Sequence, residues 1–227
     1  MNVLGVRYSY CNKSRNLVSL VYEKLYAQFG NLKWWPAKTP FEMMVGAVLV
    51  QNTAWRNVEK AIANFGEDLT PQRILLLTID ELIEIIRPSG FFNQKAIYLK
   101  ALTVWFEGYG FSIEAVRLKP LEMLRKELLA VKGIGKETAD SILLYAFIFP
   151  TFVVDAYTMR LCARLPINAG KSYDAVKEYF EANLPVSVDV YNNYHAVIVE
   201  NAKKFCRKTK PLCVECPLNN VCERMGL

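Results

Sequence analysis

The sequence predicts an all-α fold. Apolar residues recur at the three- and four-residue spacing of amphipathic helices along nearly the whole chain, and no alternating strand pattern competes with them. Two segments, Thr39-Pro40-Phe41-Glu42 and Thr78-Ile79-Asp80-Glu81, have the capping-box pattern that begins a helix. With 227 residues and 52% hydrophobic content, the chain can form one large domain or two small ones.

The first helix is expected over Ser14 to Phe29, because apolar residues occur there at helical spacing and Gly30 follows as a stop signal. The two capping boxes begin helices over residues 39–50 and 78–86. Helical spacing predicts the others over residues 54–65, 94–106, 121–130, 136–149, 157–165, 173–183 and 191–204. The longest uncharged stretch, Ser141 to Val154, has fourteen residues and contains Pro150. It is too short to span a bilayer and is interpreted as a buried central helix.

A glycine-containing segment, Lys132-Gly133-Ile134-Gly135-Lys136, separates two of these helices. The two glycines permit a very short hairpin in backbone conformations that a side chain would forbid. Without Cβ atoms in the way, N–H groups at the start of the second helix can approach a DNA phosphate, which the helix dipole also favours. An isolated Gly-x-Gly is more often an ordinary turn, so the prediction depends on the residues that follow.

Those residues include Asp155, which comes twenty positions after Gly135 and directly follows Val153 and Val154. The carboxylate is expected just beyond a long buried helix, where it can keep its charge beside a bound sugar. It is the candidate catalytic residue.

Four cysteines near the carboxyl end have the spacing Cys-x6-Cys-x2-Cys-x5-Cys: Cys206, Cys213, Cys216 and Cys222. Four thiolates so close in sequence would repel one another without a cation, so the pattern predicts a metal site. Zinc, disulfides and free thiols are the alternatives to an iron–sulfur cluster. Cys11 and Cys162 fall outside the pattern and are interpreted as ordinary thiols, with Cys162 buried.

The hairpin, the Thr-Ala that follows it, the downstream Val-Asp and the cysteine spacing together resemble the helix-hairpin-helix DNA glycosylase superfamily, which has the endonuclease III fold. The resemblance implies two lobes, one over residues 37–150 and one formed by residues 1–36 with 151–227, and DNA lying over the cleft between them. It also implies that Asp155 acts at C1′ and that the four cysteines bind a [4Fe-4S] cluster. The cluster is expected to order a loop whose basic residues face phosphates: Lys203, Lys204, Arg207, Lys208 and Lys210.

Several segments between residues 34 and 157 resemble the 3-methyladenine branch of that superfamily. They are Trp34-Trp35-Pro36, Gln51-Asn52-Thr53-Ala54-Trp55, Arg87 through Ala96, and Lys132 through Asp140. Some members of the branch lack a cluster, so the match is to a cluster-bearing version. The resemblance implies a base pocket of Trp34, Trp35, Pro36, Trp55 and Glu137. It also implies that Gln51 fills the space that the flipped base leaves in the base stack, and that Phe91 or Phe92 inserts as a wedge into the opposite strand. It further implies DNA contacts from Lys132, Gly133, Ile134, Gly135, Lys136 and Thr138. Ordinary core packing is the alternative for the aromatic residues.

The residue before Thr138-Ala139 indicates which kind of glycosylase activity to expect. Endonuclease III has a lysine there that attacks C1′, whereas this chain has Glu137, and Lys136 lies about 100° further round the helix. The sequence therefore predicts a monofunctional glycosylase that removes alkylated purines, chiefly 3-methyladenine, by hydrolysis. A mismatch, uracil or adenine glycosylase of the same fold and a non-catalytic iron–sulfur DNA-binding protein are the alternatives.

The charge agrees with an anionic partner, since 28 basic and 22 acidic residues give a net charge of +6. The amino-terminal residues do not have the pattern of a secretory signal. We therefore expect a monomer in the cytoplasm of a prokaryotic cell, associated with the nucleoid, that binds double-stranded DNA containing a damaged base and no membrane. His195, the single histidine, lies beside Ala196, Val197 and Ile198 and is interpreted as a satisfied helix residue, not a catalyst.

Overall fold

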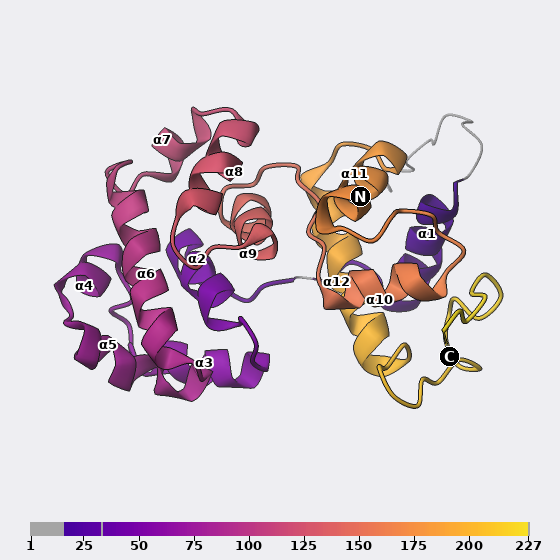
Figure 1. The fold of residues 1–227 in the computed structure, drawn as a ribbon, viewed down its shortest axis with the longest axis horizontal. Coiled ribbons are helices and arrows are strands. Elements are labelled where there is room, and N and C mark those ends of the chain that lie inside the picture. Colours follow the sequence, from indigo (N-terminus) through magenta and orange to yellow (C-terminus); the bar gives the residue numbers. More distant parts are fainter. Residues whose placement is uncertain (1–15, 33, 227) are drawn as a thin grey trace, which may run out of the picture.

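The computed structural model of the chain describes residues 16–32 and 34–226. Every regular element in these residues is a helix, which confirms the all-α prediction. The helices form two lobes (Figure 1). The first lobe contains α2 (Pro40–Leu49), α3 (Trp55–Ala63), α4 (Pro71–Leu76), α5 (Ile79–Ile86), η1 (Arg87–Ser89), α6 (Phe92–Glu107), α7 (Ile113–Arg117), α8 (Leu121–Ala130) and α9 (Lys136–Ser141). The second contains α1 (Leu17–Phe29), α10 (Ala156–Arg164), α11 (Tyr173–Asn183), α12 (Val188–Lys204) and the carboxyl-terminal loop, and η2 (Ile142–Ala146) connects the two.

Both predicted helix starts are confirmed, but only the one at Thr78 has a complete capping box. The Thr39 hydroxyl accepts a hydrogen bond from the Glu42 N–H at the start of α2. At the start of α5 the Thr78 side chain accepts from the Glu81 N–H, and the Glu81 carboxylate accepts from the Thr78 N–H. Each bond satisfies a backbone group that the first turn of a helix leaves without a partner.

Two short helices, α4 and α7, were not predicted because six and five residues are too few to show a helical period. Their capping signals are nevertheless present in the sequence. Thr70 caps α4 and is followed by Pro71, and the Ser112 hydroxyl caps α7.

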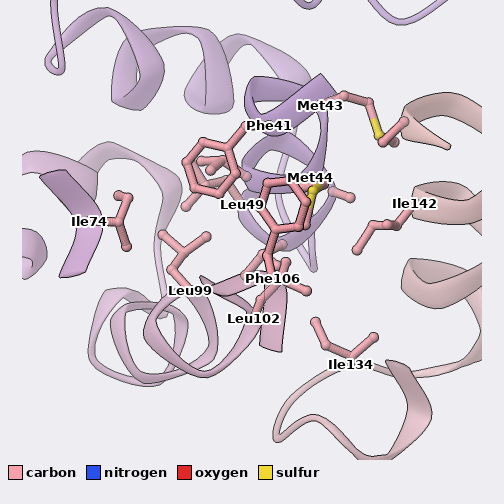
Figure 2. Packing of buried hydrophobic residues seen from close by; sticks show 14 of the residues in the cluster. Phe41, Met43, Met44, Leu49, Ile74, Leu99, Leu102, Phe106, Ile134 and Ile142 are labelled. Carbon is pink, nitrogen blue, oxygen red and sulfur yellow. The ribbon is translucent and has the colours of Figure 1, made fainter. Parts of the chain in front are cut away.

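The hydrophobic core of the first lobe surrounds α2, of which eight of ten residues are buried. Figure 2 shows Phe41, Met44 and Leu49 of this helix facing Leu99, Leu102 and Phe106 of α6. The rings of Phe41 and Phe106 stack with centroids 6.1 Å apart. Because α2 is enclosed on nearly all sides, the residues just after it are held firmly in place.

A separate core holds the second lobe together. It contains Val18, Val21 and Leu25 of α1 with apolar residues of α10, α11 and α12. Phe152, which precedes α10, stacks on Phe180 of α11 with ring centroids 4.5 Å apart. Two independent cores explain why the molecule has two lobes.

The connecting segment η2 corrects the prediction of one helix over residues 136–149. The chain is α-helical only to Ser141, and a π turn follows in which the Phe147 N–H donates to the Ile142 carbonyl. Helical structure then ends, since Pro150 has no N–H and restricts the residue before it. In this turn Ile142 packs into the first core and Leu144 into the second.

A buried carboxylate also links the lobes. Asp140 of α9 is fully buried and accepts two hydrogen bonds from Arg125, at 2.8 and 3.1 Å. It accepts two more from Thr151, at 3.2 Å, and from the Tyr173 hydroxyl at the start of α11, at 2.8 Å. These charge-assisted bonds fix α9 against the second lobe.

Candidate active site

Asp155 lies at the amino terminus of α10, and only 8% of its surface is exposed. The two preceding valines are buried, as expected for a segment that passes through the second core. One carboxylate oxygen accepts hydrogen bonds from the Thr158 N–H at 2.7 Å and the Thr158 hydroxyl at 2.9 Å. The other lies 3.4 Å from Nε2 of His195.

These contacts keep Asp155 charged. Burial alone acts to raise the pKa of Asp155, but His195 and the two hydrogen bonds from Thr158 together outweigh it and hold the pKa below its usual value. The carboxylate is therefore ionised at neutral pH, and it can stabilise positive charge that develops beside it.

Glu137, in the first turn of α9, behaves differently. Partial desolvation by the surrounding protein atoms, and after it the nearby charge of Asp155, raise the pKa of Glu137 to about 7. The side chain is nevertheless accessible from solvent. Near pH 7, therefore, only part of the molecules have a charged Glu137 side chain.

His195 of α12 is a site residue that the sequence interpretation missed. Its Nδ1 lies 2.6 Å from the Tyr145 hydroxyl, and Nε2 faces Asp155 without a regular hydrogen-bond partner among the described residues. The interpretation of His195 as a satisfied helix residue is therefore wrong for Nε2, while its interpretation as a residue that is not a catalyst stays a prediction. A lone histidine within an apolar run was the available signal, but only the packing of α12 against α10 brings it to Asp155.

The three predicted pocket tryptophans gather beside these residues. Trp35 contacts Trp55 and Tyr145 with ring centroids 5.4 and 5.2 Å apart, and the Trp34 ring meets His195 edge to face at 6.2 Å. Neither the Trp34 nor the Trp35 indole N–H has a hydrogen-bond partner in the described part of the chain, although both are buried. Pro36, which follows them, is exposed.

The backbone of the hairpin requires glycine at position 133 but not at position 135. Gly133 has φ +84°, and a Cβ atom there would lie 2.1 Å from the Tyr98 ring. Gly135 has φ −86°, which any residue adopts, so the prediction that both glycines need a special conformation is wrong for Gly135. No atom lies within 4 Å of the position that a Cβ at Gly135 would take, so the backbone there is open.

The other hairpin residues differ in exposure. Ile134 and Thr138 are buried, and Ile134 packs into the first core (Figure 2). Lys132 and Lys136 are exposed, and Lys136 forms an ion pair with Asp174 of α11. The Lys136 amine is thus engaged away from the tryptophans, in the direction that its position on the helix predicts.

Gln51, just after α2, is tied to this hairpin. Its side-chain amide donates to the Gly133 carbonyl at 3.1 Å and to the Thr138 hydroxyl at 3.0 Å. Of the two candidate wedge residues, Phe91 is 63% exposed, whereas Phe92 packs against the first core with the Arg87 guanidinium above its ring.

Lys95, which the sequence interpretation also missed, connects the end of α2 to the segment that precedes Phe91. Its ammonium is buried and donates to the carbonyls of Leu49 and Ser89, both at 2.8 Å. These carbonyls lie at the end of α2 and just before Phe91. Burial lowers the pKa of Lys95 to about 8.

The four cysteines of the loop that follows α12 line one cavity together with Arg164, Phe205, Asn219 and Arg224. Arg164 donates to the Cys206 sulfur at 3.1 Å and to the Arg207 carbonyl at 2.8 Å, which anchors the loop to α10. No group of three or more histidine, cysteine, aspartate or glutamate residues in residues 16–32 and 34–226 could hold a single metal ion.

Cys162 is buried, as predicted, and burial raises its pKa to about 12. Cys11 lies outside the described residues, as does the beginning of the predicted helix at Ser14. None of the helices in the described residues is long and apolar enough to cross a membrane.

Comparisons with known proteins identify the family. The family described as HhH-GPD superfamily base excision DNA repair protein matches residues 45–185. A protein of Methanocaldococcus jannaschii, provisionally named a DNA repair glycosylase, is 48% identical over 211 residues, which cover 91% of this chain and 96% of the relative. The chain therefore belongs to the HhH-GPD superfamily of base excision DNA repair proteins. It is a DNA glycosylase of that family.

Two solved structures agree with this assignment. The H. pylori 3-methyladenine DNA glycosylase bound to 1,N6-ethenoadenine is 30% identical and has a TM-score of 0.72, and the match covers 81% of this chain and 96% of that structure. An endonuclease III–DNA complex has a TM-score of 0.78 at 22% identity, over 91% of this chain and 94% of that one. The endonuclease III-like fold that the sequence predicted is confirmed.

Proposed function

We propose that this chain is a monofunctional DNA glycosylase that flips an alkylated purine, chiefly 3-methyladenine, out of double-stranded DNA and hydrolyses its N-glycosidic bond. The observation that carries the proposal is the position of Asp155, a buried and ionised carboxylate whose neighbour His195 contacts the Trp34 ring. The 30% identity to a 3-methyladenine DNA glycosylase supports the same substrate class.

The proposed chemistry needs a negative charge beside the sugar. Alkylation places positive charge on the purine and weakens the bond to C1′, so the sugar gains positive charge as the base leaves. Asp155 stabilises that charge most strongly in the transition state, which is the condition for a faster reaction. The same carboxylate orients or deprotonates the attacking water, and no lysine occupies the position of Glu137.

The tryptophans fit a cationic ring. Aromatic faces attract cations, and Trp34, Trp35 and Trp55 with the exposed Pro36 form the proposed base pocket. Each buried indole N–H without a partner costs on the order of 1–3 kcal/mol, which an acceptor on the extruded base would offset. A cationic base would also favour the ionised form of Glu137.

The DNA contacts follow from the surrounding elements. Gln51 would fill the space that the base leaves, and the exposed Phe91 would wedge the opposite strand. The open backbone at Gly135 and the exposed Lys132 would approach phosphates, as would the basic residues that precede and follow Cys206. We place the protein on damaged duplex DNA as a monomer, in the cytoplasm near the nucleoid.

We infer that the cysteines bind an iron–sulfur cluster and not zinc, on the basis of their spacing. Zinc sites usually have two closely spaced ligand pairs, whereas this chain has one Cys-x2-Cys pair flanked by two longer loops. A [4Fe-4S] cluster needs four cysteines facing one larger space, and Cys206, Cys213, Cys216 and Cys222 line one cavity. The cluster would order the loop and hold its basic residues toward DNA.

We also propose that each lobe is a domain, one over residues 37–150 and one formed by residues 1–36 and 151–227. The two separate cores support a division into two domains, with Leu144 of the first range packing into the second core and Trp35 of the second range packing against the first. The part of this proposal that concerns residues 1–15 lies outside the described residues.

Base release from a panel of duplexes tests the function. Under single-turnover conditions, duplexes with 3-methyladenine, 7-methylguanine, uracil, a mismatched thymine or adenine, and an oxidised pyrimidine should differ, with 3-methyladenine released fastest. Fastest release of uracil or a mismatched base would instead assign the chain to another branch of the fold. No release from any duplex, despite binding, would indicate a non-catalytic DNA-binding protein.

A further inference from the structure

We infer that Tyr145 and His195 are positioning residues for the excision reaction: the Tyr145 hydroxyl fixes the proton of His195 on Nε2, where it holds the Asp155 carboxylate. This inference rests on the proposed function, because it assigns Asp155 to the reaction. It adds two residues that neither the sequence motifs nor the family comparison assign.

The geometry permits one favourable arrangement of protons in the neutral imidazole. The Tyr145 oxygen lies 2.6 Å from Nδ1, and the Asp155 Oδ2 lies 3.4 Å from Nε2. With the proton on Nδ1, a bare nitrogen lone pair would face an ionised oxygen. With the proton on Nε2, Tyr145 donates to Nδ1 and the imidazole N–H faces the carboxylate.

Tyr145 is well suited to donate. Burial first, and the charge of Asp155 second, raise the pKa of Tyr145 well above its usual value, so the hydroxyl keeps its proton. Thr158 occupies the other oxygen of Asp155 through two hydrogen bonds. The other oxygen of Asp155 therefore faces His195, which would complete the set of donors around the carboxylate if the 3.4 Å separation shortened.

The backbone supports this assignment. Tyr145 lies in the π turn η2, where the predicted α-helix would give a different side-chain register, and π turns occur frequently at functional sites. The turn packs against α12, which carries His195, and α12 packs against α10, which begins after Asp155. Tyr145 of η2, His195 of α12 and Asp155 at the start of α10 thus form one continuous row of side chains.

The same pair contacts the proposed base pocket. Trp35 packs on Tyr145 and Trp34 meets His195, so a base stacked on the tryptophans would lie directly beside the pair. The 3.4 Å separation is long for a hydrogen bond. Contacts of this kind commonly tighten when substrate binds, and we expect this one to do so.

The tautomer of His195 tests the inference without any substrate. Because the chain has one histidine, full-length protein labelled with ¹⁵N only in histidine gives the signals of a single imidazole. We expect the neutral imidazole to give the signals of the Nε2–H tautomer. Tyr145→Phe should shift the signals toward a mixture of tautomers, and Tyr191→Phe, on the same helix as His195, should not. An Nδ1–H tautomer in the wild type, or no change in Tyr145→Phe, would overturn the inference.

Excision rates test the positioning role separately. The amide nitrogen of a glutamine can take the place of Nε2, so His195→Gln should keep most of the single-turnover rate while His195→Leu loses about tenfold or more. Tyr145→Phe should lose about fivefold alone and nothing further in the His195→Gln background, because an amide has no tautomer to fix. Binding to an abasic duplex should stay unchanged in all four variants.

Equal losses in His195→Gln and His195→Leu, or additive losses in the double variant, would contradict the positioning role. If the wild type excises no alkylated base, the proposed function fails. The histidine spectrum then still decides whether Tyr145 and His195 are arranged as inferred.

Discussion

Lys95 in the first lobe and Asp155 in the second lobe are both buried ionisable residues, and the surrounding protein affects their charges in opposite ways. In the first lobe, burial disfavours the charge of Lys95, whose pKa falls to about 8, and its partners are two backbone carbonyls. In the second lobe, Thr158 and His195 stabilise the charge of Asp155 against burial. The first arrangement holds backbone segments in place, and the second keeps a charge available for chemistry.

The contrast suggests a division of work between the lobes. The ammonium of Lys95 joins the end of α2 to the loop before Phe91, and Gln51 joins α2 to the hairpin. These contacts organise the elements that would read the DNA. The second lobe supplies the carboxylate and the exposed basic residues of the cysteine loop. The predictions below separate these roles.

The largest expected effect is on the cysteine loop. Cys216→Ser should abolish the cluster and much of the soluble yield, because one complete ligand set leaves no spare thiolate. Wild-type protein prepared anaerobically should be brown and contain about four irons per chain, measured by metal analysis and absorbance. Cys162→Ser, which changes a buried thiol outside the set, is the matched control and should keep the iron. Stoichiometric zinc without iron in the wild type would overturn the assignment.

Asp155→Asn should have the next largest effect. The amide keeps the shape and still caps α10 as a good N-cap residue, but it removes the charge that stabilises the developing cation. We expect the single-turnover excision rate to fall at least about 100-fold, while DNA affinity and thermal midpoint change little. Near-normal excision by this variant would remove Asp155 from the mechanism.

Lys95 should affect how the free energy of unfolding depends on pH. Its pKa is about 8 in the folded protein and near its ordinary value of 10.5 when unfolded, so the unfolded chain binds more protons between these values. The free energy of unfolding should therefore rise from pH 8 to 10.5, by on the order of 3 kcal/mol at most. Urea denaturation of Lys95→Met should show this rise reduced or absent, whereas Lys132→Met, at an exposed site, should keep it. The same rise in both variants would contradict the assignment.

Glu137 should have the smallest effect. Its pKa of about 7 means that the side chain is mostly neutral at pH 6 and mostly charged at pH 8, while Asp155, with its lowered pKa, stays charged throughout. If the charge assists a cationic base, the excision rate should rise severalfold between these pH values. Glu137→Gln should remove that limb of the pH–rate profile, and an unchanged profile would show that another group titrates there.

The sequence predicted most of the helices, and it indicated Asp155 and the four cysteines as candidate site residues, because these signals are local. Capping residues next to each other in sequence mark the helix starts, and Asp155 and the cysteines belong to continuous motifs. The comparisons confirm the family and the fold.

The remaining features depend on contacts between distant segments. Tyr145 and His195 are 50 residues apart, and Lys95 reaches Leu49 across 46 positions. The π turn arises because one segment packs into two cores, which no helical period can show. The backbone angle at Gly135 likewise follows from tertiary structure and not from residue type.

The central claim is that a water molecule, oriented or deprotonated by Asp155, attacks C1′ of the sugar, and that no amine of the enzyme does so. Borohydride reduction during the reaction with a 3-methyladenine duplex tests it most directly, because only an amine forms a reducible imine with C1′. We predict base release with no covalent protein–DNA adduct in the wild type, and a trapped adduct in Glu137→Lys, which places an amine near Asp155. Efficient trapping by the wild-type protein, through Lys136 or any other lysine, would contradict the account.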